Sequence, residues 1–197
     1  MLQPWNFQMS IEFRKQAVKS LPTAMGVYVL CDLDETPIYV GQSTDGIRSR
    51  VARHLTSARS DIIANRQIDV WEIAYVWAYP VPREDIGSLE AQLFHFFDVR
   101  SRLMNGAIPP KQTWGDPPDP QFCIQVMSDD EIYSKKEPTK RLPRQAAHYA
   151  QIVGHFLDVK NSPQIARSMT AHFLRLQNYQ NQLLYSATLL PEEEEGT

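Results

Sequence analysis

The chain has 197 residues, of which 43% are hydrophobic and 22% charged, so it can bury a core and its composition excludes wholesale disorder. Its net charge is −3, and the four glutamates at 192–195 account for more than this negative excess, so the rest of the chain is close to neutral. Any affinity for nucleic acid must therefore come from local basic patches. No run approaches 18 apolar residues and the N-terminus has no basic start followed by an apolar core, so we expect neither a transmembrane helix nor a secretory signal.

The first elements are an arm and a hairpin. Residues 1–20 mix aromatic, apolar and basic side chains, which is typical of a packing arm, and Ser10 is a suitable N-terminal cap for a helix there. Residues 26–31 (Gly-Val-Tyr-Val-Leu-Cys) and 38–41 (Ile-Tyr-Val-Gly) are β-type runs. Asp and Pro in residues 32–37 favour a turn between them, so the sequence predicts an antiparallel hairpin.

A helix, a strand and a second helix follow the hairpin. The first helix carries Arg50 and His54, which are four residues apart and therefore project from one face. Residues 69–81 have apolar and aromatic side chains at every second position, the pattern of a half-buried strand. Residues 84–99 have a broad apolar face and predict a helix, with Glu90 near the edge of that face.

The last part of the chain begins with a proline-rich loop. Residues 107–120 contain five prolines and are expected to form a loop, and residues 122–127 are suited to an extra strand. Residues 134–144 carry a net charge of +4, which suits a loop that contacts phosphates. Residues 145–158 and 163–184 predict helices. The second helix has a stripe that is either a core face or a surface for a partner or a DNA groove: Ile165, Met169, Phe173 and Leu176.

The two cysteines, Cys31 and Cys123, lack the spacing of a metal-binding pair and have apolar neighbours. We expect buried, free thiols instead of a metal site, a disulfide or a nucleophile. Free thiols suit a reducing, cytoplasmic compartment.

The hairpin and its following helix carry an unusual set of tyrosine, glycine, arginine and histidine. The first strand contains Gly-Val-Tyr at 26–28 and the second contains Tyr-Val-Gly at 39–41, with an eleven-residue step between the tyrosines. Arg50 and His54 follow on the helix. This order resembles the GIY-YIG nuclease superfamily, with valine for isoleucine in both tripeptides. The exchange keeps a β-branched apolar residue at a buried strand position.

Two residues further along extend the resemblance, which covers about residues 21–106. Glu90, in Ser-Leu-Glu-Ala-Gln-Leu, matches the family's metal-binding glutamate. Asn105, in Leu-Met-Asn-Gly, matches the asparagine that closes the family's domain.

The predicted fold class is α/β, of the α+β kind: a small three-stranded antiparallel sheet flanked by helices, followed by an α-rich C-terminal extension. We expect the GIY-YIG domain at residues 21–106, after an N-terminal arm at 1–20. Residues 107–190 are expected to form a loop and helical extension for DNA recognition or dimerisation, and residues 191–197 an acidic tail.

The resemblance implies catalytic roles for six residues: Tyr28, Tyr39, Arg50, His54, Glu90 and Asn105. Arg50 has a permanently charged, planar guanidinium that grips phosphate oxygens. Glu90 offers one carboxylate without an Asp/Glu cluster near it, so we expect a single, largely hydrated Mg²⁺ (or Mn²⁺) ion. A tyrosine is a weak base at its ordinary pKa of about 10, so Tyr28 as general base needs help from metal-bound water, Arg50 or His54. Tyr39 would contact the scissile phosphate or share the proton transfer.

Each of these residues alone has an ordinary structural explanation. Tyr28 and Tyr39 would be strand residues, His54 a surface residue and Glu90 a solvated helix carboxylate. Their joint occurrence, in the family's order and on a strand-strand-helix-strand-helix frame, favours an active site. Six further basic side chains either line a DNA track or belong to solvated faces: Arg48, Arg53, Arg59, Lys135, Lys136 and Arg141.

We therefore predict a Mg²⁺-dependent endonuclease that hydrolyses phosphodiester bonds in DNA. We expect the site-specific restriction type, acting as a homodimer because two-fold symmetry suits a palindromic site. The alternative among enzymes is a structure- or single-strand-specific nuclease in DNA repair or mobile-element processing. The alternative from another class is a catalytically silent DNA-binding or protein-interaction module of the same fold. We expect DNA as the partner, no membrane, and a cytoplasmic location.

Overall fold

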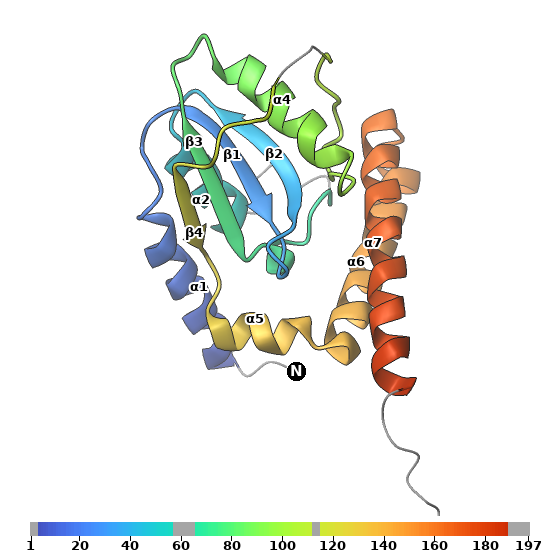
Figure 1. Ribbon diagram of the computed structural model, residues 1–197. Helices are drawn as coiled ribbons and strands as arrows, with labels where there is room; N and C mark the ends of the chain where they lie inside the picture. The colour runs from blue at the N-terminus through green and yellow to red at the C-terminus, as the bar shows by residue number, and fades with distance from the viewer. Residues whose placement is uncertain (1–3, 57–65, 112–114, 189–197) are drawn as a thin grey trace, which may run out of the picture.

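The computed structural model describes residues 4–56, 66–111 and 115–188 and is built round one antiparallel sheet (Figure 1). The strands are β1 (Gly26–Cys31), β2 (Pro37–Ser43), β3 (Tyr75–Pro80) and β4 (Phe122–Gln125), in the order β2-β1-β3-β4. The sheet thus has four strands and not the predicted three, because the extra strand suggested at 122–127 pairs with β3. β4 thereby covers backbone groups that β3 would otherwise leave unpaired.

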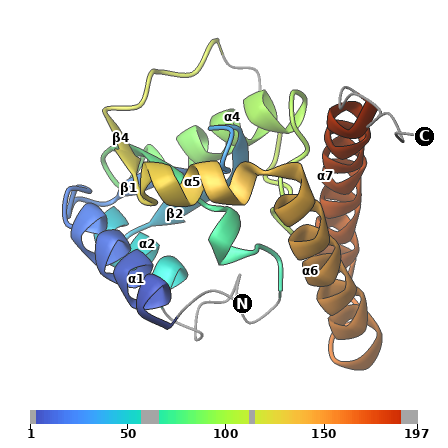
Figure 2. The same cartoon turned by 90° about the horizontal axis from the view of Figure 1, so that it is seen from below.

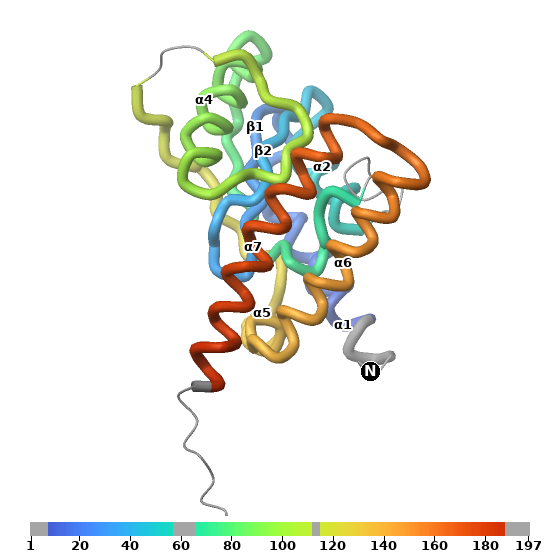
Figure 3. Tube along the Cα trace, turned by 90° about the vertical axis from the view of Figure 1, so that its right-hand side faces the viewer, coloured from blue at the N-terminus to red at the C-terminus, as the bar shows by residue number. Residues whose placement is uncertain are grey.

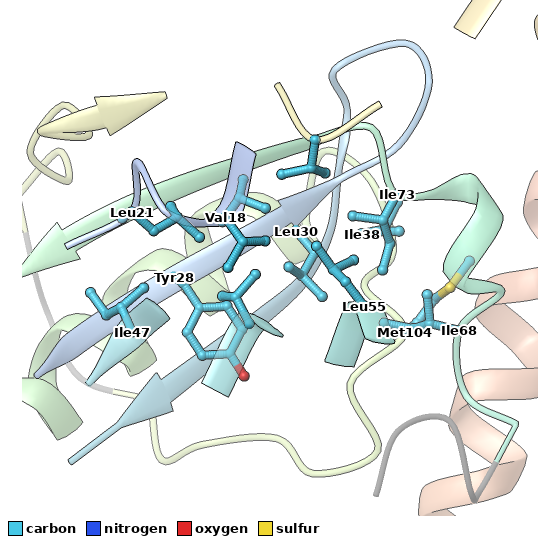
Figure 4. Close-up of a cluster of buried hydrophobic side chains, with 14 of the residues drawn as sticks. Val18, Leu21, Tyr28, Leu30, Ile38, Ile47, Leu55, Ile68, Ile73 and Met104 are labelled. Atoms are coloured by element: carbon cyan, nitrogen blue, oxygen red, sulfur yellow. The ribbon is translucent and has the colours of Figure 1, made fainter. Parts of the chain in front are cut away.

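Helices cover both faces of the sheet (Figure 1). On one face lie α1 (Pro4–Val18) and α2 (Ile47–Thr56), and on the other lies α4 (Ile86–Asp98). Alternate residues of β1 point to opposite faces, so this strand separates two hydrophobic cores. Tyr28 belongs to the core under α1 and α2, and Val29 to the core under α4. Figure 4 shows the first core, in which Tyr28 lies among aliphatic side chains.

The strand predicted at residues 69–81 is shorter in the structure. β3 begins at Tyr75, and the residues before it form a short 3₁₀ helix, η1 (Val70–Glu72). A carboxylate oxygen of Asp69 accepts a hydrogen bond from the N–H of Trp71 (3.0 Å), which caps a helical turn. The alternation of apolar residues predicted a strand from residue 69, but the hydrogen bond from Trp71 to the Asp69 side chain favours a helical turn at this point instead.

The start of α1 and the burial of one cysteine also differ from the prediction. α1 begins at Pro4, so Ser10 lies inside the helix and does not cap it. Both cysteines are free thiols, and Cys31 is buried as predicted. Cys123 is exposed, because it lies on β4 at the edge of the sheet.

Three helices form the α-rich C-terminal region: α5 (Asp129–Lys136), α6 (Pro138–Asp158) and α7 (Pro163–Thr188). α5 lies below the sheet in Figure 1, and Figure 2, seen from below, shows it crossing in front of the sheet towards the start of α6. α6 and α7 pack side by side as an antiparallel hairpin beside the sheet (Figure 3). Throughout the ranges that the structure describes, no helix is both long and apolar enough to cross a membrane.

α7 turns a largely polar face towards the domain, and the apolar stripe that we expected is only partly buried. Ile165 is buried, but Phe173 is 49% exposed. The other buried positions on α7 are Ser168, Ala171, His172, Arg175 and Tyr179. They recur at steps of three and four residues and so form one helix face. The prediction that the apolar residues of this helix form its buried face was therefore wrong for Phe173. The face that is buried is largely polar because its partners on the domain are polar groups.

Candidate active site

The β1–β2 hairpin places Tyr28 and Tyr39 on one face of the sheet. In the strand register, Tyr28 lies opposite Gly41 and Leu30 lies opposite Tyr39. Residues paired across strands, and those two apart along a strand, point to the same face, so both tyrosines face α2. A Cβ at Gly41 would lie 2.5 Å from the Tyr28 hydroxyl and 2.7 Å from a Tyr39 ring carbon. The glycine therefore leaves the space that both rings occupy.

His54 joins the two tyrosines from α2. Its Nε2 lies 2.7 Å from the hydroxyl of Tyr28, in a position where Tyr28 is 0% and His54 is 1% exposed. The ring of His54 is centred 5.8 Å from that of Tyr28 and 6.2 Å from that of Tyr39. His54 is therefore not a surface residue. The buried hydrogen bond gives the phenol and the imidazole a direct path for a proton.

Arg50 lies one helical turn before His54 on α2 and is half-buried. The apolar side chains of Ile47, Val51 and Leu55 are buried against the sheet and fix the rotation of this helix. Because Arg50 and His54 are four residues apart, they lie on the same side of α2. The guanidinium is thus carried by the same rigid element as the imidazole.

A pocket of about 400 Å³ lies beside β2, at the outer edge of the sheet. Tyr39, Glu90, Phe94 and Asn105 are among the residues that line it. Because β2 is the outermost strand, side chains from both faces of the sheet reach this pocket: Tyr39 from the α2 side, and Glu90 and Phe94 from α4. Tyr39 therefore connects the Tyr28–His54 pair with the pocket that contains Glu90.

Asn105 fastens a short segment, residues 103–105, to the edge of β2. Its Oδ1 accepts the N–H of Val40 (3.0 Å) and its Nδ2 donates to the carbonyl of Val40 (2.6 Å). The N–H of Met104 donates to the carbonyl of Ile38 (2.7 Å). These bonds hold β2 on both sides of Tyr39.

Glu90 is half-buried, and burial raises the pKa of its carboxyl above the usual value. A carboxylate in such surroundings gains from a cation beside it, and the pocket leaves room for an ion that keeps its water. Among the described residues, no group of three or more His, Cys, Asp and Glu side chains is arranged to hold a metal ion. A metal here would be held by Glu90 and water, a ligand set that suits Mg²⁺ or Mn²⁺.

Comparison with models of protein families matches residues 24–96 to the GIY-YIG catalytic domain. These residues form a GIY-YIG domain. The match confirms the resemblance that the sequence of this part of the chain predicted, and a GIY-YIG domain indicates a nuclease with DNA as substrate. Five of the six predicted site residues fall within the match, and Asn105 follows it. No curated protein matches the chain.

Three of the basic side chains predicted to contact DNA bind the protein itself. Arg141 is only 1% exposed, and its guanidinium pairs with carboxylates of Asp34 and Glu72. The prediction of a DNA contact is therefore wrong for Arg141. Lys136 lies 2.9 Å from a carboxylate oxygen of Asp34, and the largely buried Lys135 lies 3.6 Å from one of Glu131.

The basic residues of α2 are divided between two faces of the helix. Arg48 donates its Nε–H to the carbonyl of Leu21 (2.8 Å). It is two residues from Arg50 and so lies on the opposite side of α2, away from the GIY-YIG site. Arg53 is exposed, and its contact with DNA stays a prediction. Arg59 lies outside the described residues.

The basic stretch at residues 134–144 is helical and docks on the GIY-YIG domain, so the prediction of a phosphate-contact loop was wrong. The GIY-YIG domain contributes four carboxylates: Asp32, Asp34, Asp69 and Glu72. The C-terminal helices contribute four cations: Lys136, Arg141, Arg144 and Arg175. The basic side chains of this stretch, which we expected to contact DNA, thus pair with carboxylates of the same protein.

Sequence motifs missed the residues that the C-terminal helices bring to the pocket. Lys160 lies in the turn between α6 and α7, Gln164 lies in the first turn of α7, and both line the pocket with Glu90. Gln67 lines it as well. These residues are ordinary polar positions in the sequence, and only the docking of α7 on the GIY-YIG domain reveals their place.

Proposed function

We propose that this protein is a divalent-metal-dependent DNA endonuclease with its active site at Tyr28, Tyr39, Arg50, His54 and Glu90. The observation that carries the proposal is the position of Tyr39. It contacts the buried, hydrogen-bonded Tyr28–His54 pair and also lines the pocket that contains Glu90. Tyr39 therefore links the pair suited to proton transfer with the pocket whose carboxylate is suited to holding a cation.

The residues divide the chemistry of phosphodiester hydrolysis between them. The Tyr28 hydroxyl donates its own proton to Nε2 of a neutral His54 as it takes one from the attacking water, so the imidazole ends the step protonated and the phenol neutral. The guanidinium of Arg50 binds the phosphate oxygens on which negative charge develops. Glu90 would hold a divalent metal ion, which would supply stabilisation of the charge on the phosphate and the leaving oxygen. Asn105 keeps β2, and with it Tyr39, in place.

The first test is cleavage of a supercoiled plasmid in Mg²⁺ or Mn²⁺ and in EDTA. We expect Glu90→Gln to bind DNA like the unmodified protein and to cleave at least about 100-fold more slowly, because it loses a metal ligand and transition-state stabilisation of several kcal/mol. Glu84→Gln is the matched control, since Glu84 is exposed just before α4, and it should cleave normally. Equal cleavage by the Glu90→Gln variant would remove Glu90 from the proposal.

The finer biological role that we propose is site-specific, restriction-type cleavage by a homodimer. Support comes from the docking of the C-terminal helices through buried ion pairs, since a recognition element held at a fixed offset from the cut gives sequence-defined ends. Digestion of a mixed DNA panel, followed by sequencing of the ends, tests this role. Cuts at junctions or in single strands would indicate repair or mobile-element processing instead. Sedimentation with and without the cognate DNA tests the dimer.

Binding without cleavage in any divalent metal would indicate the third possibility, a catalytically silent DNA-binding module. The buried Tyr28–His54 hydrogen bond argues against it. A structural core position is filled more simply by apolar side chains than by a phenol and an imidazole that must satisfy each other.

A further inference from the structure

Side chains from the first turns of α7 form hydrogen bonds with the segment 103–105, on the side that faces away from β2. Arg167 donates from Nη1 to the carbonyl of Leu103 (2.7 Å) and to that of Asn105. The neighbouring Ser168 donates its hydroxyl to the carbonyl of Met104 (2.8 Å). All three carbonyls of the segment are thus bound by α7, while the other side of the segment is bound to β2.

The same guanidinium also reaches the helix that carries Glu90. Its Nη2 pairs with a carboxylate oxygen of Asp98, the last residue of α4. Its central carbon lies 5.1 Å from the ring centroid of Phe94, which is one turn beyond Glu90 and lines the pocket. Arg167 therefore touches both walls of the pocket: the segment that clamps β2, and α4.

An arginine suits this position for a geometric reason. Its planar guanidinium presents several donors in a fixed arrangement, so one side chain can bind two carbonyls and a carboxylate together. A lysine at the same position keeps the charge but offers a compact, flexible ammonium that cannot reproduce this arrangement. Arg167 is 11% exposed, so water competes little for these bonds.

We propose that Arg167 is a positioning residue of the active site, which sets the place of Tyr39 relative to Glu90 through the segment 103–105 and the end of α4. The proposal rests on the nuclease function proposed above and gives the C-terminal helices a role in the reaction. A displacement of about 1 Å between reacting groups can lower a rate about 100-fold. Loss of Arg167 should therefore slow the chemical step without weakening the binding of DNA.

The kinetic test compares Arg167→Lys and Arg167→Met with the unmodified protein below their melting temperatures. We expect kcat to fall on the order of 10- to 100-fold, with KM for DNA within about twofold.

Arg144→Lys is the matched control, because Arg144 is also a partly buried arginine of the C-terminal helices that pairs with two groups, Asp69 and Glu72. It should lower the melting temperature and leave kcat unchanged. If both Arg167 variants keep the unmodified kcat, the proposal is overturned; if the Met variant does not fold, the Lys variant decides.

A double-mutant cycle with Asn105→Ala asks whether both residues act through one segment. The combined variant should lose little more activity than the more damaged single variant, because either change alone releases residues 103–105. Losses in kcat that simply multiply would show that Arg167 does not act through Asn105 and would overturn the proposal.

Hydrogen exchange gives a readout that needs no substrate. The N–H groups of Val40 and Met104, which are bound across the edge of β2, should lose protection in Arg167→Lys and keep it in Arg144→Lys. Unchanged protection would overturn the positioning role even if the enzyme is active. A wild-type protein that cuts no DNA would overturn the nuclease function instead, and the exchange result would still stand on its own.

Discussion

Gly41 determines whether the two tyrosines of the GIY-YIG site can lie together. Its role is spatial. A Cβ at this position would lie 2.5 Å from the Tyr28 hydroxyl and 2.7 Å from a ring carbon of Tyr39, which is far closer than ordinary van der Waals contact. Tyr28 is fully buried and its ring has little room to move, whereas Tyr39 is only partly buried and can be displaced. The position of the Tyr28 hydroxyl against His54 thus depends on a residue that carries no chemistry.

We predict that Gly41→Ala leaves the protein folded and lowers DNA cleavage on the order of 100-fold, because the added methyl group displaces the tyrosine rings. Circular dichroism would check the fold, and plasmid cleavage in Mg²⁺ would measure the loss. Gly154→Ala in α6 is the control, since a Cβ there meets nothing within 4 Å. It should stabilise the helix by about 1 kcal/mol and cleave normally. Cleavage by Gly41→Ala at the normal rate would contradict a catalytic need for the tyrosine pair.

The site residues divide into those that the sequence reveals and those that it does not. Tyr28, Tyr39 and His54 lie close in the sequence, within one hairpin and helix, and the resemblance to the GIY-YIG family identified them as a set. Glu90 and Asn105 followed from the resemblance to the GIY-YIG family. Arg167 could not be predicted, because two of its partners are backbone carbonyls 62 and 64 residues away, which leave no trace in the side-chain pattern, and its third partner, Asp98, is 69 residues away.

At the scale of elements, most helices and strands could be predicted, but the buried face of α7 could not. Periodicity identifies apolar positions, and Ile165 is indeed buried. His172 and Arg175 are buried as well, since the domain offers a carbonyl of Gln67 to the first and a carboxylate of Asp32 to the second. A polar face is buried only where the partner is polar, and that partner comes from a distant part of the chain.

The ion pairs that dock the C-terminal helices predict a large stability effect at Arg141. We expect Arg141→Met to lower the free energy of unfolding by about 3–5 kcal/mol, because the substitution leaves the buried Oε1 of Glu72 without its guanidinium. Urea denaturation at pH 7 measures this change. The adjacent, exposed Lys140 is the control, and Lys140→Met should leave the unfolding midpoint unchanged. A loss in Arg141→Met no larger than in Lys140→Met would show that these pairs do not stabilise the docked helices.

At the scale of the whole molecule, the pocket is shared between the GIY-YIG domain and the C-terminal helices. The domain contributes Tyr39 and Glu90, and the α6–α7 region contributes Lys160 and Gln164. Most other cations of these helices are paired with carboxylates of the protein. Lys160 instead places a positive charge at the pocket, where a phosphate of bound DNA can meet it. A DNA strand that brings a phosphate to Glu90 and Arg50 would pass close to it.

Lys160 is therefore predicted to contact a backbone phosphate of the bound DNA. Lys160→Ala should weaken binding to all DNA sequences alike and reduce the slope of log K against log salt concentration by about 1, as expected for the loss of one phosphate contact. Fluorescence anisotropy with the inactive Glu90→Gln protein as background measures binding without cleavage. Lys140→Ala removes the same charge at the far end of α6, about 30 Å along the helix, and should leave the slope unchanged. Equal slopes for the two variants would mean that the DNA does not follow the side of the pocket formed by the C-terminal helices, and that these helices serve the site through position alone.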